Sequence, residues 1–175
     1  MSGNYVVPGA NPNIETGVQA VLGGTNINVT GTITEPIINS TYSVVSERAN
    51  TANTFVITGT TQATAQNVLS ITLTTDYTSN ISMWGNFSLL TNTNTIRDVS
   101  YFFQTTINGQ TQVVGNIFRT SFGGTGHSIT CPILATIAGV ASGDIAITLK
   151  IFASVASVFT IGPTQILAIG NISQD

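Results

Sequence analysis

The stretch RDVSYFFQTTINGQTQVVGNIF, Arg97–Phe118, decides the fold of this 175-residue chain. Its first half alternates as a strand does, and the residues on one side are Val99, Tyr101, Phe103, Thr105 and Ile107. Asn108-Gly109 comes next. This dipeptide is a strong hairpin signal because both central positions of a type I′ turn need a positive φ. Residues 110–118 then return as a second strand, so the stretch predicts a long antiparallel hairpin.

The same alternation recurs along the chain, with turn residues between the runs. No helical period is sustained over a useful length. We expect strands at residues 53–59, 67–75, 81–90, 97–107, 110–118, 124–137, 145–153 and 164–172. About eight antiparallel strands at this spacing predict an all-β chain that forms a sandwich or a jelly roll. Together with the resemblances described below, we expect a single jelly-roll sandwich.

Charged residues make up 6% of the chain, against about 25% in an ordinary soluble domain. The four Lys and Arg residues are scattered along the sequence, which argues against a nucleic-acid partner. So few charges are explained either by a solvent-exposed surface of uncharged polar residues or by a surface that other copies of the chain cover. We favour the second interpretation, which makes identical subunits the expected partners.

The longest apolar stretch, Ile133–Gly162, is not expected to span a membrane. Ser142-Gly143-Asp144 interrupts it, Pro163 ends it, and its second half alternates as a strand does. Residues 1–13 contain no basic residue and no apolar core, so no signal peptide is expected. The single cysteine, Cys131, excludes an internal disulfide framework.

The segment Val21–Asn39 has one narrow apolar edge and no obvious core of its own. We interpret residues 1–39 as an extended N-terminal arm or short shaft, and residues 40–175 as the jelly-roll domain. An unpaired strand edge either aggregates or pairs with a specific partner, and here we expect that partner to be a neighbouring subunit. The apolar residues expected at that assembly interface are Ile27, Val29 and Ile33. The alternative is that Val21–Asn39 is the first strand pair of the sandwich.

Trp84 is the fourth candidate interface residue. It is out of phase with Ile81, Met83 and Phe87, so we expect it to point away from the core. Aromatic side chains are enriched at subunit interfaces, which is the interpretation we favour. The alternative is a platform on which a sugar ring stacks.

Residues able to carry out catalysis are sparse. His127 is the only histidine, and the seven acids are dispersed without a calcium-loop spacing. No nucleophile elbow or phosphate-binding loop occurs. The sequence therefore indicates no catalytic residue, no metal site and no cofactor, and the protein is not expected to be an enzyme. A hydrolase that assembles two carboxylates in space is the remaining catalytic alternative.

Two parts of the sequence resemble known families. Thr106–Gln112 (TINGQTQ) and Ala141–Ile172, which runs from ASGD through an alternating strand to a final apolar strand, resemble the second half of tumour-necrosis-factor/C1q-like jelly rolls. Gly17–Asn39 (GVQAVLGGTNINVTGTITEPIIN) is similar to segments of virion fibre and capsid-associated proteins of tailed phages and large DNA viruses.

These resemblances imply a virion structural protein, assembled in the host cytoplasm, that forms a homo-oligomer as a capsid or fibre-head component. They imply a trimer first and a pentamer second, with other capsid proteins as further partners. The alternatives are a pentameric penton subunit and a carbohydrate- or receptor-binding head with a host glycan as partner.

Overall fold

The computed structural model describes residues 27–31, 36–40 and 44–172. The chain divides into two units, Met1–Tyr42 and Ser43–Asp175, and each is described by itself. In the first unit, β1 (Ile27–Gly31) pairs antiparallel with β2 (Pro36–Ser40). Ile27 and Val29, two of the expected interface residues, therefore lie on a strand that pairs with β2 along one edge, and their role at an interface stays a prediction. Ile33 lies outside the described residues.

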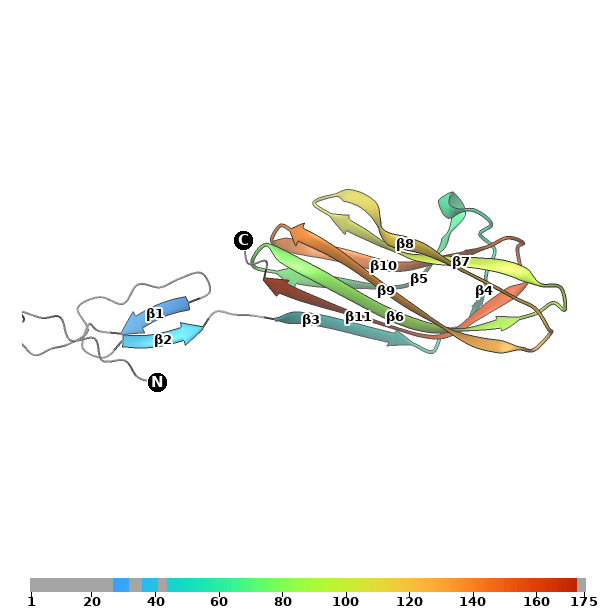
Figure 1. Ribbon diagram of the computed structural model, residues 1–175, viewed down its shortest axis with the longest axis horizontal. Helices are drawn as coiled ribbons and strands as arrows, with labels where there is room; N and C mark the ends of the chain where they lie inside the picture. The colour runs from blue at the N-terminus through green and yellow to red at the C-terminus, as the bar shows by residue number, and fades with distance from the viewer. Residues whose placement is uncertain (1–26, 32–35, 41–43, 173–175) are drawn as a thin grey trace, which may run out of the picture. The chain divides into compact units, whose positions relative to one another are not determined.

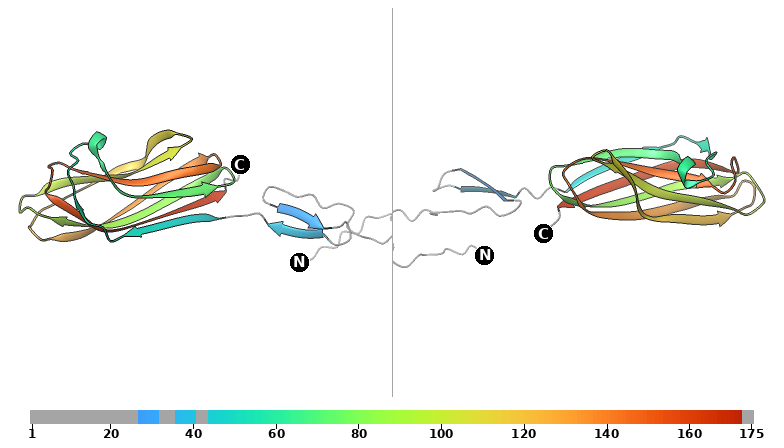
Figure 2. Two further views of the ribbon diagram at one scale, coloured as in Figure 1. Left: turned by 180° about the vertical axis from the view of Figure 1, so that it is seen from behind. Right: turned by 90° about the horizontal axis from the view of Figure 1, so that it is seen from above.

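The second unit is all β apart from one short 3₁₀ turn, as Figures 1 and 2 show. Its elements in chain order are β3 (Val45–Thr51), β4 (Phe55–Val56), η1 (Gln62–Thr64), β5 (Gln66–Thr75), β6 (Ser79–Thr91), β7 (Arg97–Ile107), β8 (Gln110–Phe122), β9 (Ser128–Val140), β10 (Gly143–Ala153) and β11 (Phe159–Ile172). None of the described elements is a helix long and apolar enough to cross a membrane.

The strands form two antiparallel sheets, and their order identifies a jelly roll. The first sheet has the order β5-β10-β7-β8, and the second has the order β3-β11-β6-β9, with β4 added beside β11. The chain crosses to the other sheet after most strands and stays in the same sheet only between β3 and β4 and between β7 and β8. Two interleaved four-stranded sheets of this kind are the double Greek key of the jelly roll. The predicted fold class is confirmed.

The core lies between the two sheets and is built by alternation. On β10, Ile145, Ile147, Leu149 and Ile151 are fully buried, and the residues between them are partly exposed. From the opposite sheet, β6 contributes Ile81, Met83, Phe87 and Leu89, each at most 1% exposed. Since side chains alternate across a strand, each sheet presents one apolar face to the other and one face to solvent.

The β7–β8 hairpin forms where the sequence predicts it. Asn108 (φ 50°) and Gly109 (φ 76°) both occupy the left-handed region, as a type I′ turn requires. A register shift between Tyr101 and Phe103 places a bulge in the hairpin. Tyr101 and Phe103 both stay buried despite this shift, and Phe102 between them is also buried.

The first strand of the sandwich differs from the prediction. Residues 53–59 were expected to form a full strand, but only Phe55–Val56 pair with β11. The edge of the sheet is instead β3, whose exposed Glu47 and Arg48 hide its alternation in the sequence. Charged residues on an edge strand block pairing with a further strand. Because these charges replace the apolar alternation of an inner strand, β3 can be recognised as a strand only once its place at the edge of the sheet is known.

Thr105 on β7 has a fully buried hydroxyl with no hydrogen-bond partner among the described residues. Because an unpaired buried hydroxyl is destabilising, Thr105→Val is expected to raise the free energy of unfolding by about 1 kcal/mol. Thr106→Val is the matched control, since the Thr106 hydroxyl faces outward and is 2.9 Å from the Thr111 hydroxyl. Urea denaturation of both variants measures the effect. Equal changes in the two variants would contradict the prediction.

Candidate functional site

Trp84 lies on β6 and points away from the core, as the sequence predicts. Its side chain is 40% exposed, whereas Met83 beside it is fully buried. Trp84 therefore belongs to the outward face of the second sheet, near the middle of a central strand. The phase argument made from the sequence is confirmed for this residue, and its role at a subunit interface stays a prediction.

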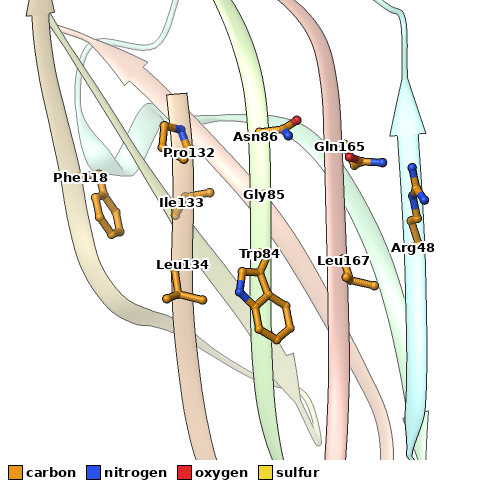
Figure 3. Close-up of a pocket in the computed structure, with 10 residues that line it drawn as sticks. All are labelled: Arg48, Trp84, Gly85, Asn86, Phe118, Pro132, Ile133, Leu134, Gln165 and Leu167. Carbon is orange, nitrogen blue, oxygen red and sulfur yellow. The ribbon is translucent and has the colours of Figure 1, made fainter. Parts of the chain in front are cut away.

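The strand register aligns Trp84 with two leucines and an arginine. Trp84 lies opposite Leu134 of β9 on one side and Leu167 of β11 on the other, and Leu167 lies opposite Arg48 of β3. Leu134 is 52% exposed. Figure 3 shows this row of four side chains crossing the four strands of the sheet. We call Leu134, Trp84, Leu167 and Arg48 the Trp84 row.

A second row of different chemistry lies next to the Trp84 row. Asn86 of β6 is opposite Pro132 of β9 and Gln165 of β11. In the orientation of its side-chain amide that satisfies both partners, Gln165 accepts hydrogen bonds from Arg48 Nη2 and from Arg48 Nε, the latter at 2.7 Å. This contact holds the guanidinium of Arg48 beside the second row (Figure 3).

The two rows line an open groove with a cavity volume of about 550 Å³. We call it the Trp84 groove. No acidic residue is among those that line it in the described part of the chain, and Arg48 is the one charged lining residue there. Its walls and floor are thus mostly apolar, with two amides and one guanidinium, which is the composition expected of a small-molecule site.

Gly85 fixes the sheet under the groove. A Cβ atom at this position would lie 2.9 Å from Ile133 Cγ2 and 3.2 Å from both Ile166 Cγ2 and Phe103 Cζ. The absence of a side chain lets the core close tightly beneath β6. Because the strand that carries Trp84 cannot shift inward or outward easily, the indole ring has a rigid support.

A second surface is formed by the loops at the end of the sandwich where β11 begins. The loop after β10 is tied to the connection after β4 by the Ser157 N–H, which donates to Ile57 O at 2.7 Å. It is tied to the loop after β6 by the Asn92 N–H, which donates to Val158 O at 2.8 Å. The loop after β6 is tied to the loop after β8 by the Thr125 N–H, which donates to Asn94 Oδ1 at 2.8 Å. These bonds join four connections into one unit, which we call the loop end.

The loop end exposes apolar side chains. Ile96 is 69% exposed, Val56 is 41% exposed and Val155 is 39% exposed. The segments that carry Ile96 and Val155 are joined by two hydrogen bonds: the Asp98 N–H donates to Ser154 Oγ at 3.1 Å, and the Ser154 N–H donates to Asp98 O at 2.9 Å. Exposed aliphatic residues on a rigid surface are typical of a protein–protein contact.

The ionisable groups suggest structural rather than chemical roles. Asp98 accepts hydrogen bonds from Arg119 and Ser121, and these hold the pKa of Asp98 below its ordinary value. In the described part of the chain this is the one ion pair, and it joins Asp98 to a residue of β8 rather than to the neighbouring Arg97. Burial raises the pKa of the Cys131 thiol to about 11, so the thiol is protonated at neutral pH.

His127 and the acidic residues do not form a metal site in the described ranges. No group of three or more His, Cys, Asp or Glu side chains there could hold a metal ion. His127 is exposed beside Gly124, whereas Cys131 is buried in the core. The two residues therefore belong to different environments, although they are only four positions apart.

Sequence reasoning found Trp84 but missed the other members of the groove. Leu134, Leu167, Gln165 and Arg48 lie on three other strands, and only the pairing register brings them together. A weak signal exists in the sequence, because Leu134 and Leu167 are apolar residues out of phase with the buried positions of their own strands. The loop end carries no comparable signal, since its residues come from separate connections.

No known family model matches the sequence, and no curated protein matches it. Solved structures do resemble the fold. The structure of the Gx strain of infectious bursal disease virus matches with a TM-score of 0.50 at 13% identity, over 85% of this chain and 37% of that chain. The VP2 subviral particle of the same virus matches with a TM-score of 0.51 at 15% identity, over 79% of this chain and 35% of that chain.

A protein described as Eiger TNF from S. frugiperda matches with a TM-score of 0.46 at 9% identity, over 77% of this chain and 96% of that chain. At identities this low the likeness to the viral structures shows the fold alone. The chain spans just over a third of the length of the viral chains it resembles. It therefore has a jelly roll like that found in proteins of viral particles, while a head of the tumour-necrosis-factor type stays a prediction.

Proposed function

We propose that this chain is a structural component of a virion and that it assembles with identical copies of itself. The observation that carries the proposal is the loop end, a hydrogen-bonded surface with exposed Ile96, Val56 and Val155 on a chain with 6% charged residues. The jelly roll supplies a rigid body that can be repeated in a shell or a fibre head, and its likeness to proteins of viral particles supports this role.

The mechanism is geometric rather than catalytic. A surface with few charges has little long-range repulsion between copies, so exposed apolar side chains can be buried on contact. In a closed ring of three or five copies, each copy contacts one neighbour with one surface and the other neighbour with a second surface, and all copies use the same two surfaces. A trimer or a pentamer would bring loop ends together around an axis, with other capsid proteins as outer neighbours.

The sequence-derived interface residues stay part of the proposal. Ile27 and Val29 on β1, with Ile33, would contact a neighbouring copy, and Trp84 would add an aromatic contact. A stable interface buries about 800 Å² on each partner, and one aromatic side chain supplies about 150–250 Å² at most. Trp84 therefore contributes only part of any such interface.

The test is the absolute mass of the full chain in solution, measured by light scattering over a range of concentrations. A discrete trimer or pentamer is the expected result, because an interface of standard size would hold copies together at micromolar concentration. A chain that remains a monomer at the highest concentration would contradict self-assembly. The mass also decides between the trimer and the pentamer.

A carbohydrate-binding head is the second candidate function, and one specific observation favours it. The exposed Trp84 ring has two amide side chains, Asn86 and Gln165, in the adjacent row. Aromatic rings flanked by planar amides suit sugars, which combine apolar faces with many hydroxyl groups.

A further inference from the structure

The Trp84 groove is better matched in size to a small ligand than to a second protein. Its apolar part consists of Trp84, Leu134 and Leu167 in one row across three strands, with Phe118, Pro132 and the buried Ile133 beside them. Even if fully covered, these side chains fall short of the roughly 800 Å² that each partner buries in a specific interface. The cavity volume of about 550 Å³ lies in the range of about 300–1,000 Å³ found for ligand pockets.

The polar groups of the groove lie to one side of the indole ring. Asn86 is two residues along β6 from Trp84 and therefore on the same face of the sheet. Its side chain makes no hydrogen bond that the structure records in the described ranges, so its amide oxygen and its two N–H donors face solvent. Gln165 lies opposite Asn86 on the next strand. A ligand stacked on the ring would thus meet amide groups along its edge.

The charge of the groove indicates the sign of the ligand. Arg48 contributes the one positive charge, and no described lining residue is acidic. Gln165 accepts from Nε and Nη2 of Arg48, which orients the guanidinium. Arginine carries five N–H donors in a fixed fork, so three remain for a ligand. An oriented guanidinium with free donors matches a carboxylate better than a hydroxyl.

We propose that the Trp84 groove binds an acidic oligosaccharide, with a neutral sugar stacked on Trp84 and a carboxylate-bearing sugar at Arg48. Trp84 and Arg48 lie two strands apart, with Leu167 between them. Neighbouring strands are about 4.8 Å apart, so the two residues are separated by about 10 Å, roughly the span of two linked sugar rings. The proposal builds on the carbohydrate-binding candidate and gives Trp84 a ligand in place of the contact with a neighbouring copy. It does not require self-assembly.

Trp84 supplies the measurement, because it is the single tryptophan of the chain. Its fluorescence reports directly on a ligand that covers the ring. The full chain is titrated with 3′-sialyllactose and, separately, with lactose, which lacks the acidic sugar. A saturable change in fluorescence is expected for 3′-sialyllactose, with a Kd of about 1 mM, and lactose is expected to bind about tenfold more weakly.

Variants separate the roles of the groove residues. Arg48→Gln is expected to remove the preference for the acidic sugar, while Asn86→Ala weakens both sugars. Arg97→Gln is the matched control, since Arg97 is exposed on the first sheet and does not line the groove. Far-ultraviolet circular dichroism checks that each variant is folded.

Three results would overturn the proposal. The first is no saturable change with either sugar, and the second is equal affinity for both. The third is a change in the mass of the oligomer on Trp84→Ala, because the groove would then be covered by a neighbouring copy. Failure of sugar binding with an intact oligomer would leave self-assembly standing. Sugar binding by a monomer would support the groove and contradict self-assembly.

Discussion

Phe103→Ala is expected to lower the free energy of unfolding by about 3–5 kcal/mol. Phe103 lies near the centre of β7, its side chain is fully buried, and the tip of its ring fills the space over Gly85 in the opposite sheet. Neither Gly85 nor the β-sheet backbone can move in to replace the lost ring. The substitution therefore leaves a cavity in addition to the lost burial of apolar surface.

This loss is a large fraction of the total stability of a domain, which is about 5–15 kcal/mol. Phe152→Ala is the matched control. Phe152 is half-buried on the outward face of the first sheet, where its ring packs against Phe102 with the ring centres 6.4 Å apart. Its removal is expected to cost less than half as much. Thermal and urea denaturation of both variants measure the difference, and equal losses would contradict the assignment of Phe103 to the centre of the core.

Local patterns predicted much of this fold because each strand carries its own evidence. The alternation of Ile145, Ile147 and Leu149 indicates which side of β10 is buried without any knowledge of its neighbours. Asn108-Gly109 specifies a turn in two residues. A single sandwich or jelly roll of about eight strands is then expected from the number and spacing of the runs, since a chain of this length forms one core.

The parts that the sequence did not reveal depend on contacts between distant residues. β3 has a charged pair where an inner strand would have apolar residues, and its edge position explains this only after the sheet order is known. Arg48 and Trp84 are separated by 36 positions and by one intervening strand. No local pattern reports that β11 lies between their strands.

The candidate site was therefore found only in part. Trp84 was identified by its position in the alternation of its own strand, which is a local property. The groove around it depends on the pairing register between strands, which is not a local property. The loop end has the same limitation, because the segments that carry Ile96 and Val155 are joined through the hydrogen bonds between Asp98 and Ser154. Surfaces assembled from several strands or loops require the pairing before their residues can be grouped.

If the chain self-assembles through the loop end as proposed, Ile96→Asp is expected to dissociate the oligomer. Among the large apolar side chains of the second unit whose exposure the structure describes, Ile96 has the largest exposed fraction. The backbone at Ile96 packs against Gly123, where an added Cβ would lie 2.9 Å from Ile96 N. The loop end is thus held in place, and the substitution changes its surface rather than its fold. Burying an unpaired carboxylate in a contact between copies costs several kcal/mol per copy, which would weaken association by at least about a hundredfold.

Ile117→Asp provides the control for this prediction, because it makes the same chemical change at a residue of β8 that is 41% exposed and lies outside the loop end. Light scattering of the two variants should give a monomer for Ile96→Asp and the native mass for Ile117→Asp. The opposite pattern would move the interface to the edge of the first sheet. A native mass in both variants would remove the loop end from the assembly, since a carboxylate at its most exposed apolar position could not be accommodated in a dry contact between symmetric copies.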